Sequence, residues 1–168
     1  MSHSIALLGS LRSDGNTARA LHRLVEGHPC HVLDLRHQRI AHFSYEQEYA
    51  DDDDFIGIVE RIVEAPVTVL ATPVYWYSYS TPMKIFIDRF SDLLVSQKPL
   101  GRKLRGCRFA LLSTGSDPAP DATLTQAFRN FCDYLGIGNV GMVYACEDGP
   151  FHDEESVASV RKHLEIPS

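Results

Sequence analysis

The stretch GSLRSDGNTARAL, residues 9–21, directly follows a short apolar run at residues 5–8. The apolar run predicts a buried strand, and Asn16 and Thr17 begin a helical pattern that ends near Gly27. Free backbone N–H groups and the positive end of the helix dipole make such a helix start suited to an anion. Asn and Thr are also common in ordinary capped turns. The stretch therefore predicts a strand–loop–helix unit that either binds an anion or simply caps a helix.

The same order of strand and helix continues along the chain. Apolar runs predict strands at 5–8, 30–35, 67–72, 109–113 and 140–145. Apolar stripes at helical spacing predict helices over 16–27, 55–63, 81–94, 124–135 and 157–164. Several of the strands are continuously apolar, which is typical of a parallel sheet covered by helices on both faces. We therefore expect a single α/β domain over residues 1–168, with a long loop at 36–49.

Composition limits the classes of partner. The 168 residues are 44% hydrophobic and 23% charged, which indicates a soluble globular protein. The net charge is −6, which disfavours binding to nucleic acid or to anionic membranes. No segment has the length of a membrane span. We therefore expect a small-molecule partner, with no nucleic acid and no membrane.

The cysteines and histidines show no metal-binding pattern. Cys30, Cys107, Cys132 and Cys146 lie far apart without a CxxC pair, and the eight histidines show no HExxH spacing. We expect no metal site, and we expect each cysteine to be a small buried side chain. The first residues lack the pattern of a signal peptide, so the expected location is the cytoplasm.

Three loops follow strands whose carboxyl ends border the ligand crevice of an open parallel sheet. The first loop, residues 9–17, offers Ser10, Arg12, Asn16 and Thr17 as donors to a phosphate. A Walker loop is excluded because no GK[ST] follows, and the dinucleotide pattern GxGxxG is also absent. The first loop therefore predicts a site for one terminal phosphate.

The other two loops suit a flat ring. The stretch ATPVYWYSYSTPMKIFIDRF, residues 71–90, contains an aromatic loop at residues 73–79, in which Tyr75, Trp76, Tyr77 and Tyr79 are expected to be exposed. Exposed aromatic side chains border a planar ligand or another subunit. The small-residue loop STGSDPAPDA, residues 113–122, leaves room for a ring beside the backbone.

These motifs together resemble the flavodoxin-like NAD(P)H-dependent FMN reductase family. GSLR at 9–12 with GNT at 15–17 is similar to its phosphate loop. PVYWYS at 73–78, followed by PMK at 82–84 and FIDR at 86–89, is similar to its flavin-ring loop and the next helix. The order of elements matches over almost the whole chain, which implies a doubly wound five-stranded parallel sheet in the order 2-1-3-4-5. One departure is the small-residue loop, where the family often has paired glycines and this chain has TGSDP at 114–118.

The resemblance also implies site residues. The FMN phosphate is expected on Ser10, Arg12, Asn16 and Thr17. The isoalloxazine ring is expected against Pro73, Val74, Tyr75, Trp76, Tyr77, Ser78, Thr114, Gly115 and Ser116. No catalytic side chain is expected, because the flavin carries out the difficult step and the protein binds and orients it.

The implied activity is oxidation of NADPH or NADH through bound FMN, with electrons passing to a quinone, a free flavin, an azo or nitro compound, or a metal ion. One alternative is a flavodoxin-type carrier that serves a protein partner without oxidising NAD(P)H. Another is an interaction module that keeps the fold without the cofactor. We also expect a homodimer, because apolar side chains are predicted near the site at Tyr77, Tyr79, Leu93, Phe43 and Tyr45.

Overall fold

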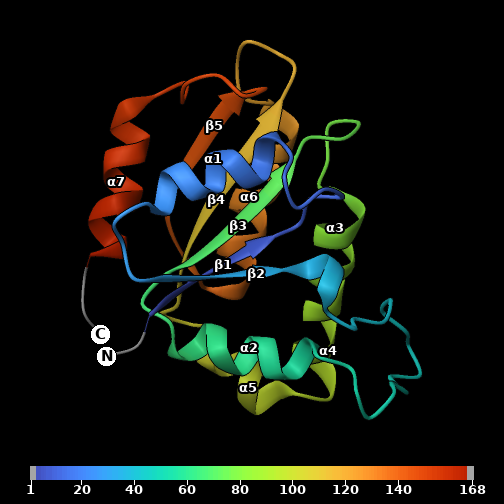
Figure 1. The fold of residues 1–168 in the computed structure, drawn as a ribbon. Coiled ribbons are helices and arrows are strands. Elements are labelled where there is room, and N and C mark those ends of the chain that lie inside the picture. Colours follow the sequence, from blue (N-terminus) through green and yellow to red (C-terminus); the bar gives the residue numbers. More distant parts are fainter. Residues whose placement is uncertain (1–2, 166–168) are drawn as a thin grey trace.

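The structure is a computed structural model that describes residues 3–165. Its centre is a parallel sheet of five strands in the order β2-β1-β3-β4-β5 (Figure 1). The strands are β1 Ser4–Leu8, β2 Cys30–Asp34, β3 Thr68–Pro73, β4 Arg108–Gly115 and β5 Gly138–Cys146. The predicted strand order is confirmed. The strand order reverses beside β1, so the carboxyl ends of β1 and β3 flank the expected ligand crevice.

Helices cover both faces of this sheet. One face carries α1 Asn16–Val25 and α7 Glu154–Leu164. The other carries α2 Phe55–Glu64, α3 Thr81–Asp88, α4 Asp92–Val95, α5 Lys98–Lys103 and α6 Ala122–Leu135, with 3-10 turns at Leu35–His37 and Arg89–Ser91. No helix among residues 3–165 is both long enough and apolar enough to cross a membrane.

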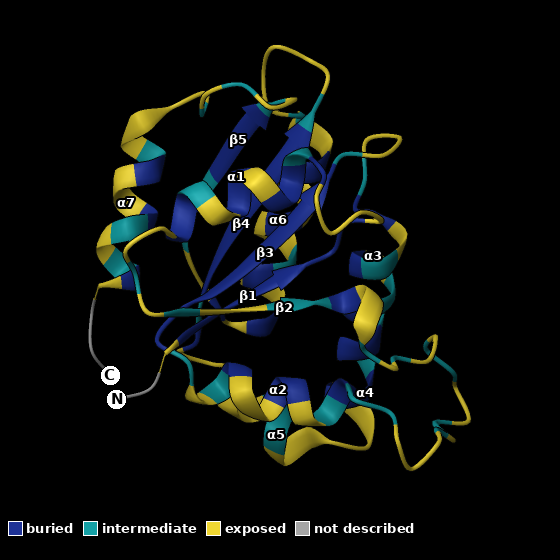
Figure 2. Cartoon of the chain, viewed as in Figure 1, coloured by how far each residue is buried: buried dark blue, intermediate teal, exposed yellow. Residues whose placement is uncertain are grey.

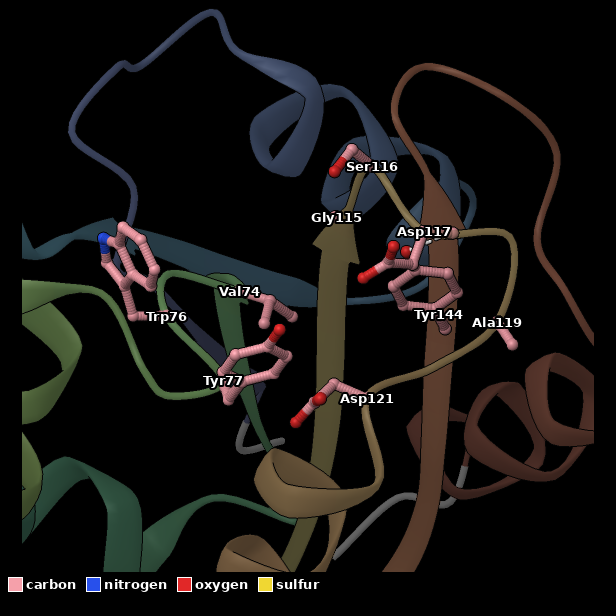
Figure 3. Close-up of a pocket in the computed structure, with 9 residues that line it drawn as sticks. All are labelled: Val74, Trp76, Tyr77, Gly115, Ser116, Asp117, Ala119, Asp121 and Tyr144. Carbon is pink, nitrogen blue, oxygen red and sulfur yellow. Dashed lines mark hydrogen bonds between the residues drawn. The ribbon is translucent and has the colours of Figure 1, made fainter.

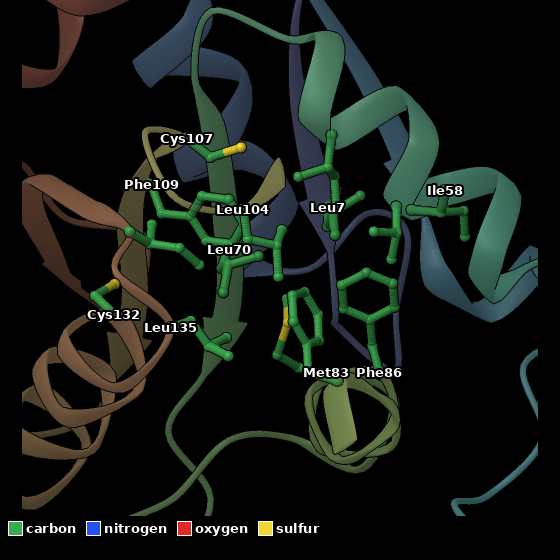
Figure 4. Packing of buried hydrophobic residues seen from close by; sticks show 14 of the residues in the cluster. Leu7, Ile58, Leu70, Met83, Phe86, Leu104, Cys107, Phe109, Cys132 and Leu135 are labelled. Atoms are coloured by element: carbon green, nitrogen blue, oxygen red, sulfur yellow. The ribbon is translucent and has the colours of Figure 1, made fainter. Parts of the chain in front are cut away.

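Alternation along the strands divides the core into two parts. In β1, Ile5 and Leu7 pack toward α2 and α3, whereas Ala6 and Leu8 pack toward α1 and α7. Figure 4 shows Leu7 beside Met83 on the first of these faces. The face under α1 includes four alanines of the sheet, Ala6, Ala71, Ala110 and Ala145.

The sheet edge is partly exposed, and the helix after the aromatic loop differs from the sequence predictions. β2 is an edge strand in which His31 and Val32 are exposed. Figure 2 shows this strand as intermediate and exposed, in contrast to the buried strands at the centre of the sheet. The single helix predicted over 81–94 is divided into α3, a 3-10 turn and α4, and α5 follows it. Gly101 of α5 lies so close to Leu93 that an added Cβ would be 2.2 Å from the Leu93 carbonyl oxygen. This close approach fixes α5 against α4.

A buried arginine connects the long loop to this divided helix. Arg89 is 1% exposed, and its Nη1 and Nε lie 2.8 Å from Asp53 and 2.7 Å from Asp92. Its guanidinium also lies 3.5 Å from the centre of the Tyr49 ring. Asp53 also accepts the Phe55 N–H at 3.1 Å, at the start of α2. The pairing with Arg89 was not predicted, because it joins residues 36 positions apart.

Candidate functional site

A cleft of about 410 Å³ opens at the carboxyl ends of β1, β3 and β4. The structure brings the predicted phosphate residues and most of the predicted ring residues together here. The lining residues are Ser10, Arg12, Gly15, Asn16, Thr17, Pro73, Val74, Tyr75, Thr114, Gly115, Ser116 and Glu147. Trp76 and Tyr77 line an adjoining pocket of about 190 Å³, which we call the side pocket. Ser78 lines neither space.

The first loop leaves the start of α1 open to an anion. Gly15 is the N-cap and has no side chain, so no side-chain cap satisfies the first N–H groups of the helix. The Ser10 hydroxyl accepts the Arg12 N–H at 3.2 Å, which curls the loop. The Thr17 hydroxyl lies 2.7 Å from that of Thr114, which joins the first loop to the end of β4. These groups form a cradle of hydrogen-bond donors suited to a phosphate.

The amide of Asn16 is oriented by a neighbour on its own helix. Arg19 Nη2 donates to Asn16 Oδ1 at 2.7 Å. Because arginine can only donate, the oxygen of this amide must face Arg19, and the Asn16 NH₂ group is left to serve another acceptor. Arg19 is held in turn by Asp148, whose Oδ1 lies 2.9 Å from Nε. The sequence analysis missed Arg19, although its place one turn after Asn16 is the spacing at which helical side chains meet.

The outer part of the first loop is fixed to the edge strand. Arg36 Nη1 donates to the Leu11 carbonyl at 3.0 Å, and the Ser13 hydroxyl donates to Asp34. Partial burial by itself would raise the pKa of Asp34. Hydrogen bonds from Ser13 and Arg36 outweigh burial and hold this pKa below its ordinary value. An ionised Asp34 therefore helps hold the loop in its curled form.

The aromatic loop turns tightly at two bulky residues. The Tyr75 and Ser78 backbones exchange hydrogen bonds of 3.0 and 3.1 Å, and φ is +49° at Trp76 and +62° at Tyr77. A type I′ turn requires positive φ at both central residues, and it ordinarily uses Asn and Gly there. Such strain costs roughly 1–3 kcal/mol per residue and is typical of functional sites. Trp76 is 93% exposed and Tyr77 is 63% exposed, but Tyr79 is buried, which corrects the prediction that all four aromatic side chains are exposed.

The small-residue loop comes close to the side chain of Tyr144. A Cβ built on Gly115 would lie 3.0 Å from the Tyr144 hydroxyl, so glycine keeps the backbone open at this point. That hydroxyl donates to the Asp117 carbonyl at 2.6 Å. Burial, and then the charges of Cys146, Asp117 and Asp121, raise the pKa of Tyr144, so the phenol stays protonated.

Two lining residues escaped the sequence analysis because they belong to the fifth strand and its end. Tyr144 lies on β5 and lines the side pocket, and Glu147 follows β5 and lines the cleft. The Glu147 N–H donates to the Gly115 carbonyl at 2.7 Å. The carboxyl ends of parallel strands meet at one edge, so the loop after the fifth strand could have been inspected together with the other three.

The thiols are less uniformly buried than predicted. Cys107 and Cys132 are buried, but Cys30 and Cys146 are only half-buried. Within residues 3–165, no group of three histidine, cysteine or acidic side chains is arranged to hold a metal ion.

The cleft fits a mononucleotide with a flat ring. The uncapped helix amides, the Asn16 NH₂ group and the Thr17 hydroxyl are hydrogen-bond donors of the kind that suit a phosphate, and the backbone at Gly115 and the aromatic loop form walls that suit a flat ring. Its volume falls within the ordinary range for small-molecule sites. With the strand order 2-1-3-4-5, these features define the class of flavodoxin-like proteins that hold a mononucleotide at the β1/β3 crevice.

Comparison with known proteins identifies the family within this class. Residues 3–149 match the model of the NADPH-dependent FMN reductase family, and the chain belongs to that family. It is 34% identical over 150 residues to YwqN of Bacillus subtilis (strain 168), a protein provisionally named an NAD(P)H-dependent FMN-containing oxidoreductase. That alignment covers 80% of each chain.

Solved structures support the fold. The Trp repressor binding protein of Bacillus subtilis superposes with a TM-score of 0.72 at 23% identity, covering 98% of this chain and 99% of that one. FerB of Paracoccus denitrificans, a flavoenzyme NAD(P)H:(acceptor) oxidoreductase, gives a TM-score of 0.65 at 21% identity, with 98% and 96% covered. At these identities the likeness establishes the flavodoxin-like architecture.

Proposed function

We propose that this protein binds FMN in the cleft and uses it to oxidise NADPH or NADH, passing the electrons to a small-molecule acceptor. The phosphate would bind Ser10, Arg12, Asn16 and Thr17. The ring would lie against residues 73–78 and 114–116. The acceptor would be a quinone, a free flavin, an azo or nitro compound, or a metal ion.

One observation carries this proposal: the uncapped start of α1 and Tyr75 of the aromatic loop line one cleft, and the strained Trp76 and Tyr77 line the adjoining side pocket. The helix start supplies an anchor for a terminal phosphate. The turn and the backbone at Gly115 supply walls for a ring at the other end. An anchor and a flat slot at opposite ends of one cleft fit a flavin mononucleotide better than a dinucleotide.

FMN, when bound, supplies the hydride-accepting ring, and the protein supplies binding and orientation. The link between Thr17 and Thr114 would keep the phosphate anchor and the ring wall in fixed register. Arg19 would keep the Asn16 NH₂ group directed at the phosphate. We assign no acid or base role to a side chain.

The exposed side of the aromatic loop suits a second planar molecule. Trp76 and Tyr77 stand beside the open side pocket, where a nicotinamide could stack at the short distance that hydride transfer needs. Donor and acceptor would then use one slot in turn, which gives ping-pong kinetics. Trp76→Ala should lower turnover more than FMN affinity, because the phosphate anchor lies on another loop.

The deciding experiment is anaerobic reduction of the purified protein loaded with FMN. Addition of NADPH or NADH should bleach the flavin absorbance rapidly, and an acceptor should restore it. A flavin that remains oxidised would indicate a flavodoxin-type carrier instead. A protein that rejects FMN would indicate an interaction module. Intersecting rather than parallel double-reciprocal lines would contradict the shared slot.

We further propose a homodimer in the cytoplasm. Leu94 and Tyr134 are exposed around one hollow between α4, α5 and α6, and Val95 beside them is 61% exposed. Such apolar surface is typical of an interface, and two-fold dimers are the commonest assembly. Tyr79 and Leu93, which the sequence analysis placed in the apolar surface near the site, are buried. A monomer in light scattering at micromolar concentrations would contradict the dimer.

A further inference from the structure

The side pocket is distinct in charge from the phosphate end of the cleft. It shares Val74, Gly115 and Ser116 with the cleft, so the two spaces adjoin at the proposed ring position. Figure 3 shows Asp117 beside Tyr144, and Asp121 below Tyr77 at the start of α6. The nine lining residues include these two carboxylates and no lysine, arginine or histidine. A molecule beside the ring would therefore meet a negative wall.

The fold fixes the position of both acidic residues at the pocket. Asp121 is the N-cap of α6, and its Oδ1 accepts the Leu124 N–H at 2.7 Å. The main chain of Asp117 is fixed by the hydrogen bond from Tyr144. Within residues 3–165, neither carboxylate has a lysine, arginine or histidine nitrogen within 4.0 Å. Their charges are therefore not neutralised by an ion pair.

We propose that the side pocket is the electron-acceptor subsite, and that Asp117 and Asp121 make it select cationic or neutral acceptors over anionic ones. This inference rests on the proposed function. A pocket lined by charge of one sign attracts opposite ions and repels like ions, most strongly at low salt. Trp76 and Tyr77 complete the pocket with faces that suit planar or cationic molecules.

The electrons balance for both kinds of acceptor. NAD(P)H gives two electrons as a hydride by way of the flavin. A neutral quinone takes both electrons together with two protons, one from the hydride and one from solvent, and leaves as a hydroquinone. A one-electron metal complex takes one electron, so two complexes are reduced for each NAD(P)H oxidised and one proton is released to solvent.

The test compares acceptors of different charge on the FMN-loaded protein. With NADPH saturating, kcat/KM is measured for hexaammineruthenium(III), which is trivalent and cationic, for ferricyanide, which is anionic, and for neutral benzoquinone. The Asp117→Asn/Asp121→Asn double variant should lower the ratio of kcat/KM for hexaammineruthenium(III) to kcat/KM for ferricyanide by at least about tenfold. Added salt should reduce the difference in this ratio between the parent and the double variant. Asparagine is also a good N-cap, so α6 should be kept.

The matched control is Asp51→Asn/Asp133→Asn, which removes the same charge from exposed positions outside the pocket and should leave the ratio unchanged. Suppose that the parent reduces benzoquinone, but the pocket variant and the control both keep the parent's cation-to-anion ratio of kcat/KM. The proposal that Asp117 and Asp121 select acceptors by charge is then wrong, and the proposed function stands. If the parent flavin is never reduced by NADPH or NADH, the proposed function fails and this inference fails with it.

Discussion

Replacing Asn16 by Asp separates the folding role of the first loop from its proposed phosphate role. Asn16 is the first residue of α1 and lines the cleft. A carboxylate in the first turn of a helix is favourable to folding by roughly 0.3–1 kcal/mol because of the helix dipole. The same carboxylate would stand beside the proposed phosphate. The substitution should therefore leave the unliganded protein as stable as before, or more so, while it weakens FMN binding.

The size of the loss in FMN affinity follows from two opposing effects, repulsion by the phosphate and attraction by Arg19. Two unit charges about 4 Å apart repel by about 4 kcal/mol at an effective dielectric constant of about 20. Arg19 already lies 2.7 Å from Asn16 Oδ1 and would pair with the new carboxylate. If that pairing offsets half of the repulsion, about 2 kcal/mol remains, which is roughly a 30-fold increase in Kd.

Flavin fluorescence titration measures the Kd, and urea unfolding of the unliganded protein measures stability. Asn130→Asp is the matched control, because Asn130 lies on α6 outside the cleft and its Oδ1 also accepts a side-chain hydrogen bond, from Gln126 at 2.8 Å. It makes the same change in net charge and should leave the Kd unchanged. Raising salt to 1 M, where the Debye length falls to about 3 Å, should reduce the difference in Kd between Asn16→Asp and the parent protein. An unaltered Kd for Asn16→Asp would refute the phosphate assignment.

Four further outcomes are expected. Gly115→Ala should weaken FMN binding about tenfold or more in the same titration, because the added methyl lies 3.0 Å from the Tyr144 hydroxyl and narrows the ring wall. Arg89→Met should lower the free energy of unfolding in urea by about 3–5 kcal/mol, because it leaves buried carboxylates unpaired. Burial tends to raise the pKa of Asp53, but hydrogen bonds from Arg89 and the backbone lower this pKa below its ordinary 3.8. The ionised Asp53 therefore stabilises the fold above pH 3.8, and this stabilisation is lost as the pH falls below that value. Asp53→Asn should make the free energy of unfolding depend less on pH in this acid range. Burial raises the pKa of Cys132 to about 12, so iodoacetamide at pH 8 followed by mass spectrometry should leave this thiol unlabelled until the protein is unfolded.

Most elements of the fold could be read from local patterns. The apolar runs marked all five strands, and the helix predicted over 124–135 ends where α6 ends, before Gly136 with its φ of +71°. The prediction of one continuous helix over 81–94 was wrong. The apolar stripe continues through the 3-10 turn at Arg89, so it gives no sign of the break. Arg89 at this break pairs with Asp53, 36 residues earlier, and that long-range contact leaves no local signal.

The site divides in the same way. The sequence next to a strand end or a helix start has a recognisable pattern. The four residues predicted as phosphate donors in the first loop therefore all line the cleft. Contacts between distant segments carried none: Thr17 meets Thr114 across 97 residues, and Tyr144 reaches Asp117 across 27. Tyr79 illustrates the limit, since its place in an aromatic run predicted exposure while the packing of α3 buries it.

The sequence by itself determined the alternation of strands and helices, the parallel sheet and the position of a helix start suited to an anion, because these depend on the period of apolar residues and on caps within a few positions. Only the tertiary structure decided which side chains face the cleft, that β5 contributes Tyr144, and that Asp117 and Asp121 share one pocket with Trp76. Side-chain direction at a sheet edge depends on the packing of several strands at once, and that packing joins residues too far apart for any local pattern to record.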